Sequence, residues 1–223
     1  MAQTTIAQMV TSIVGSWTPS DYPELYKDAF NFVADLIPVD SELWHNANTL
    51  TTTSLVNTGS SVYKVLRVMR TSDSSTLQCK QIPYSDYIRG IDTTSIYYHG
   101  KSVKNPVWTW DEDGDVLVSP TGGTNRIRYW AYLTSSDFDT GDAIEVAIDM
   151  AGFPEEAHLL AIIKAGINIL YTKISDAIQD EEDAELLQLL QVQMQSLQQW
   201  FESEASRLHL PHKTLGVEID DVK

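Results

Sequence analysis

The five histidines are the side chains best suited to metal binding or proton transfer, and only two of them are close in sequence. His209 and His212 are three residues apart, a spacing that lets two imidazoles bind one metal ion on a helix. Pro211 lies between them and breaks the helical geometry that this spacing needs. No nearby cysteine or carboxylate supplies a plausible third ligand, so we expect a solvent-exposed pair and predict no metal and no cofactor.

Ser135, Ser136 and Asp137 place hydroxyl groups next to a carboxylate, the residue types of a hydrolase. The segment lacks the strand–turn–helix context of a nucleophile elbow, and no histidine has a defined relation to it. Cys79 lies in an alternation of apolar and polar residues, so we expect a small buried side chain. We therefore predict that the chain is not an enzyme, and a hydrolase using Ser135, Asp137 and a distant histidine is kept as an alternative.

Three aspartates, Asp111, Asp113 and Asp115, have a spacing found in calcium-binding loops. The EF-hand pattern needs a glycine after the third acid, whereas here Gly114 precedes Asp115 and Val116 follows it. An acidic turn with a glycine suits a backbone with positive φ. We therefore interpret these residues as the tip of a β-hairpin.

Six tryptophans and ten tyrosines are consistent with a platform for nucleic acid or carbohydrate. Stacking on nucleic acid normally comes with a basic groove, and the β region has only scattered Lys and Arg. A β-domain module that binds carbohydrate through Trp108, Trp110 and Trp130 is a second alternative. It requires all three rings on one exposed face, so burial of Trp130 would exclude it.

The net charge excludes several classes of protein. The 223 residues include 31 acidic side chains against 15 Lys and Arg, a formal charge of −16, of which residues 1–136 carry −3 and residues 137–223 carry −13. Such a charge excludes non-specific attraction to DNA or to an anionic membrane. The single cysteine excludes an internal disulfide, and no window approaches the roughly 18 consecutive apolar residues of a membrane span. We expect a soluble protein with no membrane contact.

The apolar periodicity predicts an α+β fold with N-terminal helices, a central antiparallel β region, a C-terminal αα-hairpin and an extended tail. Residues 1–43 are expected to form a helical segment. Its first helix has the apolar stripe Ile6, Met9, Val10, Ile13 and Val14. Gly15 ends this helix. Ser20 or Asp21 can cap a second helix that has Pro23 in its first turn and ends at Ile37–Pro38.

Residues 44–136 are expected to form a β-rich domain, because β-branched and aromatic residues are dense there and turn residues recur between short runs. One hairpin is expected around Asp111–Gly114, and one helical turn over Pro83–Ile88. The expected strands are Thr49–Val56, Val62–Thr71, Thr76–Gln81, Pro106–Trp110, Asp115–Ser119 and Arg126–Thr134.

Residues 137–210 are expected to form a helical hairpin that packs with residues 1–43, followed by a tail arm over residues 211–223. The first helix runs from Ala157 to Ile178 and is apolar on most of its circumference. Ala157, Ala161 and Ala165 form a small-residue row that permits close approach of another helix. The second helix has the apolar stripe Leu186, Leu190, Met194, Leu197, Phe201, Ala205 and Leu208.

The flank of this last helix is rich in glutamine and has no lysine from Asp180 to Ser206. Solvent-facing helices usually alternate Glu and Lys. Two interpretations stay open: a face that is partly buried against other protein, or a solvated helix of unusual composition. The candidate contacts with another copy or a partner are Ala157, Ala161, Ala165, Gln191, Gln195, Gln198, Trp200, Phe201, Leu210, Leu215 and Val217.

The order of elements from about Trp108 to Leu208 resembles that of head-to-tail connector proteins of tailed bacteriophages, also called adaptor or neck-ring proteins. The features that carry this resemblance are a hairpin ending in Val116–Pro120, an aromatic strand over Ile127–Tyr132, a helix start at Phe153–His158, an Ala-rich apolar helix and an acidic, Gln-rich helix. The segment Tyr22–Leu25 and the helical region around it are also similar to these proteins.

The resemblance implies a structural virion protein of the neck or tail region, made in the bacterial host cytoplasm. Members of the family form a homo-oligomeric ring, commonly a dodecamer, that binds the portal protein and the tail or neck proteins. DNA passes through the lumen without specific binding, and like charge on the ring would keep the duplex from sticking. Smaller adaptors are mostly helical, so the large β region departs from the family pattern. Another virion component, such as a tail-completion or minor tail protein, is the alternative within this class.

Overall fold

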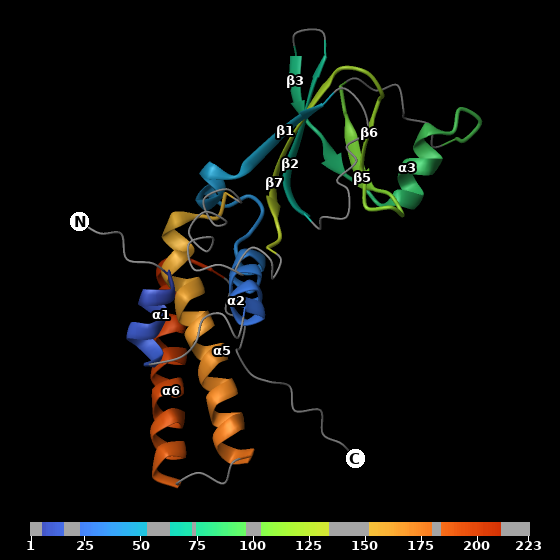
Figure 1. The fold of residues 1–223 in the computed structure, drawn as a ribbon. Helices are drawn as coiled ribbons and strands as arrows, with labels where there is room; N and C mark the ends of the chain where they lie inside the picture. The colour runs from blue at the N-terminus through green and yellow to red at the C-terminus, as the bar shows by residue number, and fades with distance from the viewer. Residues whose placement is uncertain are drawn as a thin grey trace. The chain divides into compact units, whose positions relative to one another are not determined.

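The computed structural model describes residues 6–15, 23–52, 63–72, 75–96, 104–133, 152–179 and 184–210 of the chain. The chain divides into two compact units. The helical unit combines Met1–Leu43 with Leu133–Lys223, and the β unit consists of Trp44–Tyr132. Among the described residues the fold is mixed α+β, with five α-helices and with sheets that are antiparallel except for one short pair (Figure 1). The α+β class expected from the sequence is thus confirmed.

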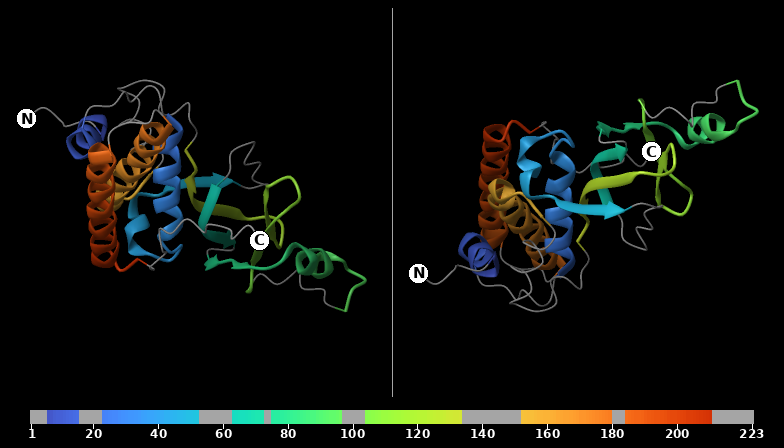
Figure 2. Two further views of the ribbon diagram at one scale, coloured as in Figure 1. Left: turned by 90° about the horizontal axis from the view of Figure 1, so that it is seen from below. Right: turned by 90° about the horizontal axis from the view of Figure 1, so that it is seen from above.

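In the described part of the helical unit, four α-helices pack together and α5 is their centre. The elements are α1 (Ile6–Val14), α2 (Pro23–Leu36), the short 3-10 turn η4 (Glu155–Ala157), α5 (His158–Gln179) and α6 (Ala184–Arg207). α5 contacts the three other helices, and Figures 1 and 2 show it between α2 and α6. A helix that is apolar around most of its circumference needs partners on several sides, which explains this central position.

α1 ends at Val14, and neighbouring helices bind the carbonyl groups that its last turn leaves free. Lys173 Nζ on α5 donates to the Val14 carbonyl at 3.0 Å, and Gln193 Nε2 on α6 donates to the Ile13 carbonyl at 2.7 Å. Burial lowers the pKa of Lys173. Gly15 follows with φ of +76°, the left-handed conformation that favours glycine after a helix. The expected helix over residues 6–14 is confirmed.

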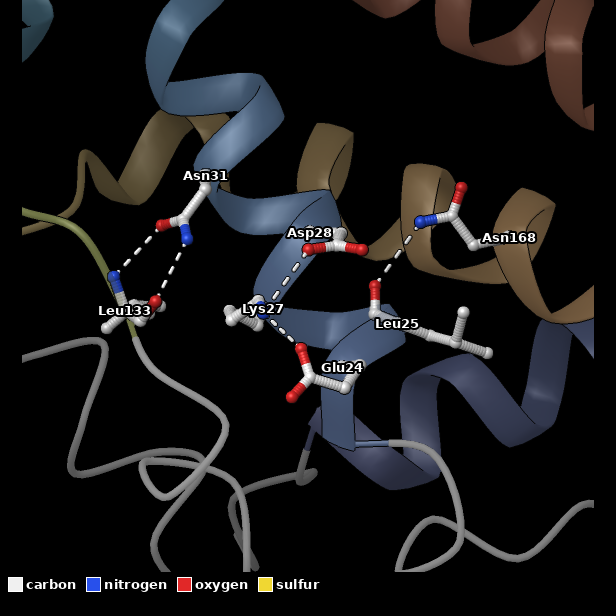
Figure 3. A network of polar contacts seen from close by, with 7 residues as sticks. All are labelled: Glu24, Leu25, Lys27, Asp28, Asn31, Leu133 and Asn168. Atoms are coloured by element: carbon white, nitrogen blue, oxygen red, sulfur yellow. Dashed lines mark hydrogen bonds and ion pairs between the residues drawn. The ribbon is translucent and has the colours of Figure 1, made fainter.

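Asn31 on α2 binds the chain at Leu133, where the chain returns to the helical unit from the β unit (Figure 3). The Leu133 amide donates to Asn31 Oδ1, and Asn31 Nδ2 donates to the Leu133 carbonyl, both at 3.0 Å. One side chain thus satisfies both backbone groups of a buried residue. Buried backbone groups without partners are costly, so this amide stabilises the return point.

We expect the substitution Asn31→Ala to lower the free energy of unfolding by about 1–3 kcal/mol, because two backbone groups of Leu133 lose their partners. Denaturant titration followed by far-UV circular dichroism measures the change. Asn168→Ala is the control, since it removes a single hydrogen bond of 3.3 Å to the Leu25 carbonyl. A loss at Asn31 no larger than the loss at Asn168 would contradict this role.

Two sheets form the β unit. The first has the order β1 (Asn48–Thr52), β7 (Thr124–Ala131), β2 (Tyr63–Ser72), β3 (Ser75–Gln78), and the second has the order β4 (Lys80–Gln81), β5 (Val107–Trp110), β6 (Val116–Ser119). Only the two-residue pair β4–β5 is parallel among the described pairs, which corrects the expectation of an entirely antiparallel region. The remaining described elements are α3 (Tyr84–Ile91), longer than the expected single turn, and the 3-10 helix η2 (Glu42–Asn46).

Side chains from both sheets form the core of the β unit. Its buried members are Val68, Cys79, Trp108, Val116, Val118 and Ile127. Val68 and Ile127 are paired across β2 and β7, so their side chains lie on the same face of the first sheet. Burial raises the pKa of the Cys79 thiol to about 11, which keeps it protonated and unreactive. The expected burial of Cys79 is confirmed.

The strand expected over Thr76–Gln81 is in fact two strands in different sheets. The Cys79 amide donates to the Val68 carbonyl at 2.8 Å and continues the pairing with β2. The backbone amide of the next residue, Lys80, donates to the Pro106 carbonyl at 2.9 Å and begins the pairing with the second sheet. The chain therefore changes sheets between these two residues. Alternation of apolar and polar residues cannot reveal such a change, because its period is two in either sheet.

The other expected strands are present with shifted ends. β1 begins one residue before the expected Thr49, and β7 begins at Thr124 rather than Arg126. Residues 53–56 and Val62 lie outside the described residues, so the end of the first predicted strand and the start of the second are untested. β7 ends at Ala131, three residues before the expected Thr134, because the described residues Tyr132 and Leu133 belong to no strand. The helix expected from Ser20 or Asp21 begins at Pro23 in the described part.

Candidate interaction surface

The outer side of α6 presents uncharged residues to solvent. Its exposed members are Leu186, Gln188, Leu189, Gln191, Val192, Gln195, Ser196, Gln199 and Trp200, and we call this set the α6 outer face. Leu189 is 64% exposed and Val192 is 63% exposed. No charged residue occurs between Glu185 and Glu202. Exposed apolar residues that gather on one face mark interaction sites more often than scattered ones do.

The inner side of α6 sets the orientation of this face. Leu197 and Phe201 are buried, and the Phe201 ring lies 6.3 Å from the Phe32 ring of α2, centroid to centroid. Gln198 Nε2 donates to the hydroxyl of Tyr171 on α5 at 3.4 Å. The helix is therefore held by apolar contacts and neutral hydrogen bonds, and its outer face has a defined direction.

The small-residue row does not contribute to this surface. Ala157, Ala161 and Ala165 are each 0% exposed. They lie inside the core of the helical unit, so assigning them to contacts with another copy was wrong for this fold. The close approach that their size permits is made by helices of the same chain, since α5 contacts α1, α2 and α6. Periodicity predicts that a helix will approach, but not which chain supplies it.

Phe201 and Leu210 are also placed inside the chain rather than on its surface. Both are buried, and the Leu210 amide donates to the Ala205 carbonyl at 3.0 Å just after the end of α6. Their assignment as partner contacts is therefore wrong as well. Leu215 and Val217, on the predicted tail arm, lie outside the described residues.

Three of the predicted contact residues do belong to the α6 outer face. Gln191, Gln195 and Trp200 are exposed there, whereas Gln198 is half-buried and bound to Tyr171. Each exposed glutamine side chain has a donor and an acceptor that remain available to another protein. Amide groups also lose less free energy than charged groups when they are buried at an interface.

Sequence reasoning missed Leu189 and Val192, the two most exposed apolar residues of the face. It also expected Leu186 in the buried stripe, whereas this residue is exposed at the start of α6. The sequence did contain a signal for Leu189 and Val192, because both are apolar yet lie outside the apolar stripe that forms the buried side of the helix. Apolar residues on the polar side of an amphipathic helix are expected to contact another protein.

The tryptophan platform required by the carbohydrate alternative is absent. Trp130 is 0% exposed and Trp108 is 6% exposed, so neither ring can serve as a sugar platform. The Trp130 ring instead packs against Trp44, with centroids 6.1 Å apart. The condition set for a carbohydrate-binding module is not met, and that alternative is excluded for these residues.

The aspartates of the predicted hairpin tip act within the turn itself. Oδ1 of Asp111 accepts hydrogen bonds from the amides of Asp113 at 2.9 Å and Asp115 at 2.7 Å, and Gly114 has φ of +80°. The hairpin between β5 and β6 is confirmed. Within the residues that the structure describes, no group of three or more His, Cys, Asp or Glu could hold a metal ion. Ser135 and Asp137 lie outside those residues.

One helical stretch, Glu155–Gln179, is apolar and long enough to cross a membrane by length and composition, which the search for uninterrupted apolar residues did not reveal. More than half of its most apolar part is buried inside the protein, and α1, α2 and α6 pack against it. We interpret it as a core helix. Among the described residues of the helical unit, Leu189 and Val192 on α6 are the most exposed large apolar residues, although Ile178 near the end of α5 is also exposed.

Neutral amides and apolar side chains on the outer side of a helix are suited to contacts with another protein. Comparison of the sequence with protein-family models and with curated proteins finds no match.

Proposed function

We propose that this chain is a structural protein of a tailed-bacteriophage particle, a head-to-tail connector subunit without catalytic activity. Copies of it form a ring that binds the capsid portal and the tail or neck proteins. In the proposed subunit, the helices of residues 1–43 and 137–210 form the ring body. The arm over residues 211–223 reaches a neighbouring subunit. The ring is located in the neck of the virion and its lumen lets DNA pass.

The observation that carries this proposal is the uncharged α6 outer face on a chain with a formal charge of −16. Identical subunits with this charge repel each other, so their contacts must exclude acidic residues. The α6 outer face meets that requirement, because its exposed residues are Leu, Val, Trp, Gln and Ser. A rigid uncharged surface can repeat around a closed ring of head-to-tail contacts.

The acidity itself supports a conduit for DNA. A duplex carries one phosphate charge per strand at every base step, so an acidic lumen repels it at every position. Weak, uniform repulsion lets the duplex slide during packaging and ejection, whereas clustered Lys and Arg would bind it. Most of the negative charge lies in residues 137–223, which contain α5 and α6.

Native mass spectrometry of the purified chain, alone and with portal protein, tests the proposal. We expect the wild-type chain to form a multi-subunit ring. The double substitution Leu189→Glu with Val192→Glu should leave it monomeric, because each new carboxylate would have to be buried in the contact at a cost of several kcal/mol. The helical content should be unchanged, since both side chains are exposed.

The control is Ile96→Glu, which places one carboxylate, half the added charge of the double variant, on a 91% exposed apolar residue of the β unit. It should associate as the wild type does. A chain that stays monomeric with and without portal protein would refute the connector proposal. Labelling of the protein in intact virions separates a neck ring from a tail-completion or minor tail protein, because these components occupy different positions.

A further inference from the structure

A hollow of about 430 Å³ lies between α2 and α5, on a different part of the helical unit from the exposed residues of α6. Its lining consists of Leu25, Asp28 and Phe32 from α2 and Lys164, Asn168, Tyr171 and Thr172 from α5. Figure 3 shows the two helices side by side, with Asp28, Leu25 and Asn168 at their junction. The hollow therefore combines apolar walls with a few polar groups, the usual composition of a binding site.

Lys164 is the cation of this hollow, and the carboxylate of Asp28 lines the same hollow without forming an ion pair with it. Lys164 Nζ lies over the Phe32 ring, 4.9 Å from the ring centroid, and forms a cation–π contact with it. Among the described residues Lys164 forms no ion pair, and the Asp28 carboxylate instead lies 3.7 Å from Lys27 Nζ. Lys27 also contacts Glu24 (Figure 3). Burial lowers the pKa of Lys164, and the more distant charge of Asp28 opposes this shift only in part.

The neighbouring polar groups define what Lys164 could bind. Asn168 Nδ2 donates to the Leu25 carbonyl, and the Thr172 hydroxyl donates to the Asn168 carbonyl. The Thr172 proton and one of the two Asn168 N–H groups are therefore already used. The Tyr171 hydroxyl accepts a hydrogen bond from Gln198, which leaves its own proton available to donate. Three donors, Lys164, Tyr171 and the second N–H of Asn168, thus point to a ligand with acceptor atoms and negative charge. The walls formed by Leu25 and Phe32 favour an apolar group next to that charge.

We propose that this hollow binds an acidic side chain of a partner protein, presented next to an apolar side chain. The carboxylate forms a charge-assisted hydrogen bond with Lys164, and the apolar neighbour packs on Leu25 and Phe32. A protein segment is favoured because the rim is open: Asp28 and Tyr171 are both exposed, so an extended chain can lie across it. On a chain of charge −16, a local cation without a carboxylate partner selects the place where an acidic segment can dock. This site does not depend on ring formation.

A titration of the full chain followed by NMR tests the site. The probe is an N-acetylated, amidated tripeptide of leucine, glutamate and leucine, and the matched probe has glutamine in place of glutamate. We expect the glutamate peptide to bind at least about tenfold more tightly, which is the effect of one charge-assisted hydrogen bond. Lys164→Gln should remove this preference and Lys164→Arg should retain much of it. Lys80→Gln, a change at an exposed lysine of the β unit, should leave it intact.

Three results would overturn the proposal. They are equal affinity for the two peptides, an undiminished preference in the folded Lys164→Gln variant, and equal loss in Lys80→Gln. Binding of hexanoate without binding of either peptide would also overturn it, because the site would then select a small free acid. Circular dichroism of each variant confirms that the fold is intact. A chain that binds the glutamate peptide but never forms a ring would support this site and refute the connector proposal, so the two can be told apart.

Discussion

Replacing Gly123 with alanine is expected to lower the free energy of unfolding of the β unit by about 2–5 kcal/mol. Gly123 has φ of +87°, a conformation that costs an L-residue free energy even in open space. A Cβ atom at this position would also lie 2.7 Å from the Thr71 carbonyl oxygen, a separation that real structures do not allow. Backbone strain and steric overlap therefore add at one residue.

The surrounding atoms have little room to move away. Thr71 lies in β2 and is paired with Thr124 of β7, so its carbonyl is part of the first sheet. Arg70 is buried and donates from Nε to the Pro120 carbonyl at 3.0 Å and from Nη2 to the Gly122 carbonyl at 2.6 Å. The guanidinium thus holds the turn against the sheet, and the added methyl group cannot be accommodated without breaking these bonds.

Gly122→Ala is the control for this prediction. Gly122 has φ of +84°, but a Cβ atom there would meet nothing within 4 Å, so only the strain of about 1–2 kcal/mol is expected. Chemical denaturation, with hydrogen exchange of β2 and β7 peptides to assign the loss to the β unit, measures both variants. Equal losses of stability at the two glycines would show that the close contact with the Thr71 carbonyl oxygen does not contribute to the effect of Gly123→Ala.

The second large effect is expected for Gly166→Leu in α5, which should destabilise the helical unit by about 2–4 kcal/mol. Gly166 is the point where α1 and α6 both come close to α5. A Cβ atom added there would lie 3.2 Å from Val14 Cγ1, 3.4 Å from Leu197 Cδ1 and 3.5 Å from Ile13 Cγ2. The rest of a leucine side chain would have to displace one of these helices, and α1 is the shorter of the two.

Gly166→Ala separates packing from helix propensity. Alanine gains up to about 1 kcal/mol over glycine inside a helix, which offsets the single close contact with Val14. We expect the alanine variant to differ from the wild type by less than about 1 kcal/mol, while hydrogen exchange in the leucine variant rises first in α1. Unchanged exchange in α1 of the leucine variant would contradict the assignment of this contact.

Much of the secondary structure followed from local patterns in the sequence. The stripe at Ile6–Val14 predicted α1 with its end at Gly15, and the turn chemistry of Asp111–Gly114 predicted the β5–β6 hairpin. These signals are local, because apolar spacing and turn residues act within a few positions of the chain. The β3–β4 break at Cys79 had no such signal, since strand periodicity does not depend on which sheet a strand joins.

The candidate site was predicted only in part, for the same reason. Composition identified the uncharged helix, and Gln191, Gln195 and Trp200 do lie on its outer side. The sequence pattern predicted the row Ala157, Ala161 and Ala165 and also Phe201 as contacts with a partner, yet these residues are buried within the chain. An apolar or small residue shows that something packs against it, without showing whether that partner belongs to the same molecule.

The sequence by itself determined the charge of −16, the mixed α+β class, the position of most helices and strands, and a last helix without charge between Glu185 and Glu202. Only the tertiary structure decided which side of that helix is exposed, that α5 uses its small residues for its own neighbours, and that Lys164 lies in a hollow without an ion-pair partner among the described residues. The physical reason is that burial and pairing depend on contacts between segments far apart in the chain. Residue type and spacing restrict those contacts without specifying them.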